Sequence, residues 1–131
     1  MLDAKLILSD DQAITTSADS TNVIDLGAYE EALGEEENLR LKIVVSEDFD
    51  SAAEDGTLKI QCLHSNESES KDPPELWSES TTFPENVLVA GYTIMDIGLP
   101  TYHQRYMSVY YIVAGSGNFT SGKVNAYIYA R

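Results

Sequence analysis

The sequence predicts a single antiparallel all-β domain of the sandwich type, and three observations carry this prediction. The chain has 131 residues, a length that normally makes one domain. Six runs rich in β-branched and aromatic residues are separated by turn-forming residues, and they span residues 20–26, 39–45, 57–63, 87–97, 105–114 and 122–129. Apolar and polar residues alternate within two of these runs, which gives each strand one dry face and one wet face, as in a sandwich.

The alternation is clearest in residues 39–45 and 57–63. In the second run, Leu58, Ile60 and Cys62 share one face, whereas lysine and glutamine side chains share the other. We therefore expect apolar residues from all parts of the chain to meet in one core. The candidates are Ile14, Val23, Ile24, Leu26, Leu41, Ile43, Leu58, Ile60, Val109 and Val124.

Three segments are expected to interrupt or join the strands. Residues 28–38 crowd five glutamates around Gly34, which favours a solvated loop or a single turn. Residues 66–85 are polar and contain three prolines, which oppose regular strand pairing, so we expect an irregular excursion held to the core by Trp77. Residues 115–118, with the sequence GSGN, predict the tip of a hairpin between the last two runs.

The N-terminal residues 1–14 alternate polar and apolar side chains with little nearby to fold against. Two interpretations are open: an extended arm that adds a strand to a neighbouring protein, and an ordinary first strand of the sandwich. Residues 1–15 lack the basic and then apolar pattern of a secretory signal. We therefore expect a soluble protein made in a reducing compartment.

The composition argues against several classes of function. Twenty-two acidic and eight basic residues give a net charge of −14, which opposes sequence-independent binding of nucleic acid. No apolar stretch approaches the roughly 20 residues of a membrane-spanning helix. Residues 1–86 hold 21 of the 22 acids, and this asymmetry indicates either acidic loops or a charged docking face.

Residues suited to catalysis or metal binding are scarce. His64 and His103 lie in different runs and have no partner at ligand spacing. Cys62 cannot form an intramolecular disulfide and is expected to be a buried thiol. The acidic loop 48–55 departs from the spacing of an EF-hand calcium loop. We expect no enzymatic activity, no catalytic residue, no cofactor and no metal site.

Seven of the eight tyrosines fall in residues 87–131. Most are expected in the core or at its edge, but Tyr110 and Tyr111 are neighbours on one strand and cannot both face inward. An exposed tyrosine suits an interface because it offers a large contact area at a low entropic cost. The candidate interface residues are Leu6, Leu8, Tyr102 and Tyr110.

Residues 1–27 (MLDAKLILSDDQAITTSADSTNVIDLG), 88–100 (LVAGYTIMDIGLP) and 105–128 (RYMSVYYIVAGSGNFTSGKVNAYI) together resemble the capsid cement, or decoration, proteins of short-tailed phages, of the Bordetella phage type. The resemblance spans nearly the whole chain. Its most specific parts are the DDQAI sequence that ends at Ile14, the NVIDLG segment at 22–27 and the FTSGK turn at 119–123. None of these is a catalytic signature.

The resemblance implies a jelly-roll β-sandwich over residues 1–131. It implies a structural protein of the virion that is made in the bacterial host cytoplasm, binds the outer surface of an HK97-type capsid and cements neighbouring capsomers. The implied partners are the phage major capsid protein and further copies of the chain itself, with a dimer favoured over a trimer. Nucleic acid and membrane are not expected partners.

Two other classes are weighed against this interpretation. A carbohydrate-binding β-sandwich module would use exposed aromatic residues such as Trp77, Tyr92 or Tyr102, with calcium in the loop 48–55. An enzyme of the cupin type would need clustered histidine and carboxylate ligands inside its barrel, and two isolated histidines do not supply them.

Overall fold

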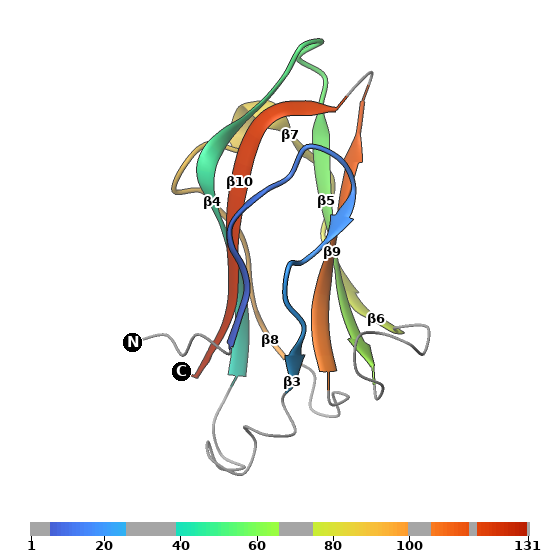
Figure 1. The fold of residues 1–131 in the computed structure, drawn as a ribbon, viewed down its shortest axis with the longest axis vertical. Helices are drawn as coiled ribbons and strands as arrows, with labels where there is room; N and C mark the ends of the chain where they lie inside the picture. Colours follow the sequence, from blue (N-terminus) through green and yellow to red (C-terminus); the bar gives the residue numbers. More distant parts are fainter. Residues whose placement is uncertain (1–5, 26–38, 66–74, 100–105, 116–117, 131) are drawn as a thin grey trace.

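The computed structural model describes residues 6–25, 39–65, 75–99, 106–115 and 118–130, and it shows two antiparallel sheets packed face to face (Figure 1). Sheet A contains, in spatial order, β1 (Ile7–Ala13), β10 (Phe119–Ala130), β4 (Leu39–Ser51) and β8 (Thr93–Gly98). Sheet B contains β2 (Ala18–Asp19) and β3 (Ile24–Asp25) beside β9 (Tyr106–Ala114), then β5 (Thr57–Ser65), then β6 (Glu75–Glu79) and β7 (Phe83–Pro84). A 3₁₀ turn, η4 (Glu85–Val87), precedes β8 in the chain.

The strand pairing is nested along the chain. The first strand, β1, pairs with the last, β10, and β2 and β3 pair with β9. Further inward, β4 pairs with β8, and β5 pairs with β6 and β7. Two sheets built from such nested antiparallel pairs form a jelly roll. The predicted fold class is therefore confirmed.

Most of the predicted core is also confirmed. The residues Ile14, Ile24, Leu41, Ile43, Leu58, Ile60, Val109 and Val124 are all at most 2% exposed. The prediction for Val23 is wrong, because Ile24 takes the inward position and Val23 is 38% exposed. Leu26 lies outside the described residues.

Several strand bounds differ from the prediction. The run 20–26 contributes only β3, whose neighbour β2 begins earlier, at Ala18. The run 87–97 is a strand only from Thr93, because Leu88 is buried in a turn that η4 starts. Within the polar segment 66–85, residues 75–79 form the edge strand β6 instead of an irregular excursion. The predicted loop 28–38 lies outside the described residues.

The predicted hairpin at residues 115–118 is wrong. The strands on either side of it, β9 and β10, belong to different sheets, and Figure 1 shows β10 bending over the end of the sandwich into the layer opposite β9. Each of the two strands finds its partners elsewhere in the chain: β9 pairs with β5 over nine residue pairs, and β10 pairs with β4 over ten. Pairing with distant strands, and not the local turn sequence, therefore determines where β9 and β10 lie.

Residues 7–13 of the N-terminal segment form the first strand of the sandwich, which was one of its two interpretations, and residues 1–5 lie outside the described residues. Two register shifts in the β1–β10 pairing turn both Leu8 and Ser9 inward, and both are at most 1% exposed. The Ser9 hydroxyl lies 2.8 Å from the hydroxyl of Tyr111 in sheet B, and the backbone N–H of Asn22 donates to the Leu8 carbonyl over 2.9 Å. β1 therefore joins the two sheets along one side of the sandwich.

Candidate functional site

The candidate interface residues fall in three different settings. Leu6 and Leu8 are 7% and 1% exposed and belong to the core, which leaves little of either side chain to contact a partner. The reason is that β1 pairs within its own sheet instead of projecting from it. Tyr110 is half-buried on the outer face of sheet B, directly opposite Gln61, whereas its neighbour Tyr111 is fully buried. Tyr102 lies outside the described residues.

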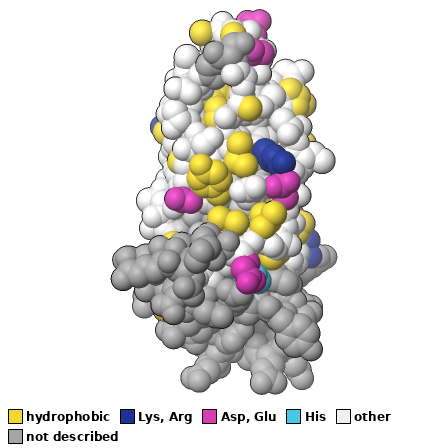
Figure 2. Space-filling model, turned by 90° about the vertical axis from the view of Figure 1, so that its right-hand side faces the viewer, with side chains coloured by type: hydrophobic (Ala, Val, Ile, Leu, Met, Phe, Trp, Pro, Cys, Tyr) yellow, Lys and Arg dark blue, Asp and Glu magenta, His cyan; other side chains and the backbone are white. Residues whose placement is uncertain are grey.

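Tyr110 belongs to an apolar patch on the outer face of sheet B, which consists of Leu63, Leu76, Tyr110 and Ile112. Strand alternation puts these side chains outside, because their neighbours Cys62 and Tyr111 face the core. Leu63 and Leu76 are direct neighbours across β5 and β6, and Leu76 is 51% exposed. Figure 2 shows hydrophobic side chains gathered over the middle of this face. The apolar patch therefore has members on β9, β5 and β6, with Gln61 and Lys59 of β5 opposite Tyr110 and Ile112.

Paired polar side chains border the apolar patch. The Lys59 ammonium lies 2.8 Å from Glu79 Oε1, and Gln61 Nε2 donates to Glu79 Oε2 over 2.8 Å. The hydrogen bond from Lys59, followed by that from Gln61, lowers the pKa of the Glu79 carboxyl. Figure 2 shows the opposite charges at the margin of the hydrophobic group. An apolar centre with a satisfied polar rim is the usual anatomy of a protein interface.

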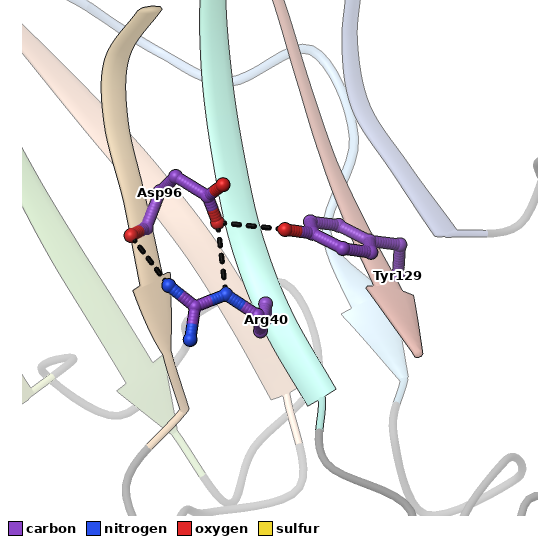
Figure 3. A network of polar contacts seen from close by, with 3 residues as sticks. All are labelled: Arg40, Asp96 and Tyr129. Atoms are coloured by element: carbon purple, nitrogen blue, oxygen red, sulfur yellow. Dashed lines mark hydrogen bonds and ion pairs between the residues drawn. The ribbon is translucent and has the colours of Figure 1, made fainter. Parts of the chain in front are cut away.

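The outer face of sheet A carries a polar network that ties three strands together (Figure 3). Arg40 on β4 donates from Nε to Asp96 Oδ1 over 3.0 Å and from Nη2 to the Asp96 backbone carbonyl over 2.8 Å. Tyr129 on β10 donates its hydroxyl to the same Oδ1 over 2.8 Å. These contacts, first that from Tyr129 and then that from Arg40, hold the pKa of the Asp96 carboxyl below its usual value.

Residues 8–128 match the Bbp16 protein family, which covers nearly all of the jelly roll. The chain belongs to the Bbp16 family. Bbp16 is a Bordetella phage protein family, so the protein is a phage protein, and the resemblance seen in the sequence is confirmed at that level. No protein with a curated description matches the chain.

Of the groups weighed for catalysis or metal binding in this Bbp16 protein, Cys62 and His64 are engaged in the fold, and His103 lies outside the described residues. Cys62 is buried against Met95, and burial raises the pKa of its thiol to about 12, so the nucleophilic thiolate is disfavoured. His64 is 8% exposed and lies 3.7 Å from Glu75 Oε2. In the described part of the chain no group of three or more His, Cys, Asp or Glu side chains is arranged to hold a metal ion.

Of the aromatic residues proposed for a carbohydrate site, Trp77 and Tyr92 are described and Tyr102 lies outside the described residues. Trp77 is half-buried and packs against the core, and Tyr92 meets Phe83 edge to face with ring centroids 6.2 Å apart. In the acidic loop, Asp48 Oδ1 accepts the backbone N–H of Ala90 over 2.7 Å. The described residues contain no helix of the length and apolar character that a membrane crossing requires.

Sequence reasoning found one residue of the apolar patch, Tyr110, and missed the others. Leu63 and Ile112 could have been found, because each falls on the opposite face from its buried neighbours in an alternating strand. Leu76 gave no such signal, because it lies in a polar, proline-containing segment whose strand is an edge strand of five residues. Its place beside Leu63 follows only from the tertiary pairing of β5 with β6.

Proposed function

We propose that this protein is a cement protein of the phage virion. It binds the outer surface of an HK97-type capsid and holds neighbouring capsomers of the major capsid protein together. The observation that carries this proposal is the match of residues 8–128 to the Bbp16 family, since it assigns nearly the whole sandwich to a phage family. A phage protein without a helix that could span a membrane in its described part fits a structural component of the particle.

The apolar patch is the contact surface that the proposal assigns to the shell. Removing the Leu63, Leu76, Tyr110 and Ile112 side chains from water favours association in proportion to the apolar area buried. The charged rim groups Lys59 and Glu79 already neutralise each other, so a partner can cover the patch without burying an unpaired charge. For a chain with a net charge of −14, this face avoids most of the repulsion from an acidic neighbour.

Self-association is part of the same proposal, with a dimer favoured over a trimer. A two-fold interface requires a surface that complements itself, and it would have to lie outside the apolar patch, because the proposal assigns that patch to the shell. Many copies that each make a modest contact across capsomer seams would stabilise the shell through avidity. The proposed mechanism is mechanical and involves no chemical step.

The direct test is co-sedimentation of the purified protein with expanded empty shells of the parent phage, over a series of salt concentrations. We expect saturable binding that resists salt, because the patch is mainly apolar. Leu76→Asp should weaken binding by about tenfold or more, because it forces a carboxylate into the buried contact. The matched pair Tyr110→Ala and Tyr127→Ala removes one tyrosine from each outer face, and only the first should weaken binding.

Three results would count against the proposal. Absence of binding by the unchanged protein would refute cementing itself. Equal losses of binding for Tyr110→Ala and Tyr127→Ala, or binding that disappears at moderate salt, would mean that the protein binds the shell through a surface other than the apolar patch. Urea unfolding of each variant shows whether a loss of binding is only a loss of folding.

A further inference from the structure

Two tyrosines on the outer face of sheet A form an aromatic surface that the cementing proposal does not use. Tyr127 and Tyr129 alternate along β10 with the fully buried Ala126 and Ile128, so both project outward. Their ring centroids are 6.0 Å apart and the ring planes are inclined by 55°. Both side chains are half-buried. The pair therefore presents ring area to solvent from a rigid strand in the middle of a sheet.

The orientation of Tyr129 is fixed by its hydroxyl group. Strand β4 lies between β10 and β8, and neighbouring strands are about 4.8 Å apart, so β10 and β8 are separated by roughly twice that spacing. To reach Asp96 on β8 over 2.8 Å, the Tyr129 side chain must lie across β4 instead of standing away from the sheet. Figure 3 shows the ring beside β4, with its hydroxyl directed toward Asp96 and the hydrogen bond passing over β4. The hydroxyl therefore holds the half-buried ring in one orientation, and the part of the ring that is not buried faces outward.

A cation lies beside this aromatic pair. Lys42 is opposite Tyr127 in the pairing of β4 with β10 and opposite Asp96 in the pairing of β4 with β8. Among the described residues Lys42 has no carboxylate at ion-pair distance, whereas the neighbouring Arg40 is paired with Asp96. The charge of Lys42 also helps to lower the pKa of the Asp96 carboxyl, so the two cations Arg40 and Lys42 lie around one carboxylate and leave one net positive charge beside Tyr127 and Tyr129.

We propose that the surface formed by Lys42, Tyr127 and Tyr129 binds an acidic polysaccharide, with a sugar ring stacked on the outward face of Tyr129 and a sugar carboxylate paired with Lys42. The C–H groups of a pyranose ring match an aromatic face, and the fixed Tyr129 ring loses little entropy on binding. The ammonium of Lys42 attracts an anionic sugar locally, against the repulsion that the net charge of −14 exerts on any polyanion. An acidic peptide would use the cation alone and leave the flat aromatic area unoccupied.

The test is calorimetric titration of the full chain with hexagalacturonate, with the neutral cellohexaose and the peptide hexaglutamate as comparison ligands. We expect hexagalacturonate to bind, and both Tyr129→Ala and Lys42→Gln to weaken it by about tenfold. Tyr129→Phe, which keeps the ring but loses its anchor to Asp96, should weaken it less than Tyr129→Ala. Tyr110→Ala on the opposite sheet is the matched control and should leave the affinity unchanged.

The proposal is overturned if hexagalacturonate does not bind, or if Tyr110→Ala weakens it as much as Tyr129→Ala. Binding of hexaglutamate at equal strength would also overturn it, and would identify an acidic protein surface as the partner. An affinity for cellohexaose equal to that for hexagalacturonate would show that Lys42 does not contribute to binding, and it would overturn the preference for an acidic sugar. Because the readout is a sugar and not a shell, the result is independent of whether the protein cements a capsid.

Discussion

Substituting Gly122 by alanine is expected to destabilise the jelly roll more than the same substitution at Gly56 or Gly91. Gly122 has a φ of 136°, a conformation that side chains with a Cβ rarely adopt. A Cβ at this position would overlap the ring of Phe49, with Cε2 only 2.7 Å away. Phe49 cannot easily yield, because it is 5% exposed and meets Phe119 edge to face with ring centroids 4.8 Å apart.

The expected loss for Gly122→Ala has two parts. Backbone strain at a φ of this kind costs about 1–3 kcal/mol. Forcing an extra carbon into a packed core costs about 1–3 kcal/mol. We therefore expect the free energy of unfolding to fall by about 2–6 kcal/mol, a large fraction of the stability of a domain of this size.

The two other glycines separate these parts. Gly91 has a φ of 94° and no atom within 4 Å of the place that a Cβ would take, so Gly91→Ala measures backbone strain alone. Gly56 has no positive φ, but its Cβ would lie 2.6 Å from Phe119 Cε1, so Gly56→Ala measures the clash alone. The loss for Gly122→Ala should exceed that of either control.

The assay is equilibrium unfolding in urea, followed by the fluorescence of Trp77, the single tryptophan, which is half-buried against the core. A loss for Gly122→Ala below about 0.5 kcal/mol, the usual range of a neutral surface change, would refute the reasoning. A loss no larger than that of Gly91→Ala would show that Phe49 moves aside freely. In the Phe49→Leu background the added loss from Gly122→Ala should shrink, because the ring that it meets is gone.

Three further predictions concern single side chains. Tyr111→Phe should lower the free energy of unfolding by about 1 kcal/mol, because it removes the buried hydrogen bond between Tyr111 and Ser9; a urea midpoint equal to that of the unchanged protein would contradict this. Cys62 should stay unreactive toward a thiol reagent at about pH 8, because the pKa of its thiol is raised to about 12. It should react once urea unfolds the chain. Fast labelling of the native protein would contradict the burial of Cys62. The pKa of the Asp96 carboxyl is lowered in the folded state, so its stabilising effect is present above the unfolded pKa and is lost as the pH falls through the folded pKa. Asp96→Asn lacks this titrating group. Between about pH 5 and pH 2 the urea midpoint of the variant should therefore fall less than that of the unchanged protein.

The buried faces of the long strands were predictable because strand alternation is a local property. Leu41 and Ile43 on β4, and Leu58 and Ile60 on β5, follow the two-residue period, and all four are buried. Prediction failed where a bulge breaks that period, since the shifts in β1 turn the adjacent residues Leu8 and Ser9 to the same side.

The remaining errors concern pairing between distant residues. A glycine-rich turn between two strand-like runs favours a hairpin, yet β9 and β10 gain more by pairing with β5 and β4 in separate sheets. The contacts on the two outer faces could not be predicted for the same reason. Leu63 meets Leu76, and Tyr129 meets Asp96, because the order of strands in each sheet brings them together. No local sequence pattern predicts that order.

The position of β10 between β1 and β4 has a consequence for biosynthesis. Sheet A has its central strand at residues 119–130, so β1 has no neighbour in sheet A until that part of the chain has left the ribosome. Pairing of Ile7 with Tyr127 closes a loop of more than a hundred residues, which makes folding slow compared with domains built from local contacts. A chain that terminates before β10 leaves the apolar sides of β1 and β4 without their shared neighbour. The outer face of sheet A, which carries Tyr127 and Tyr129 on β10, therefore forms only after synthesis has passed this strand.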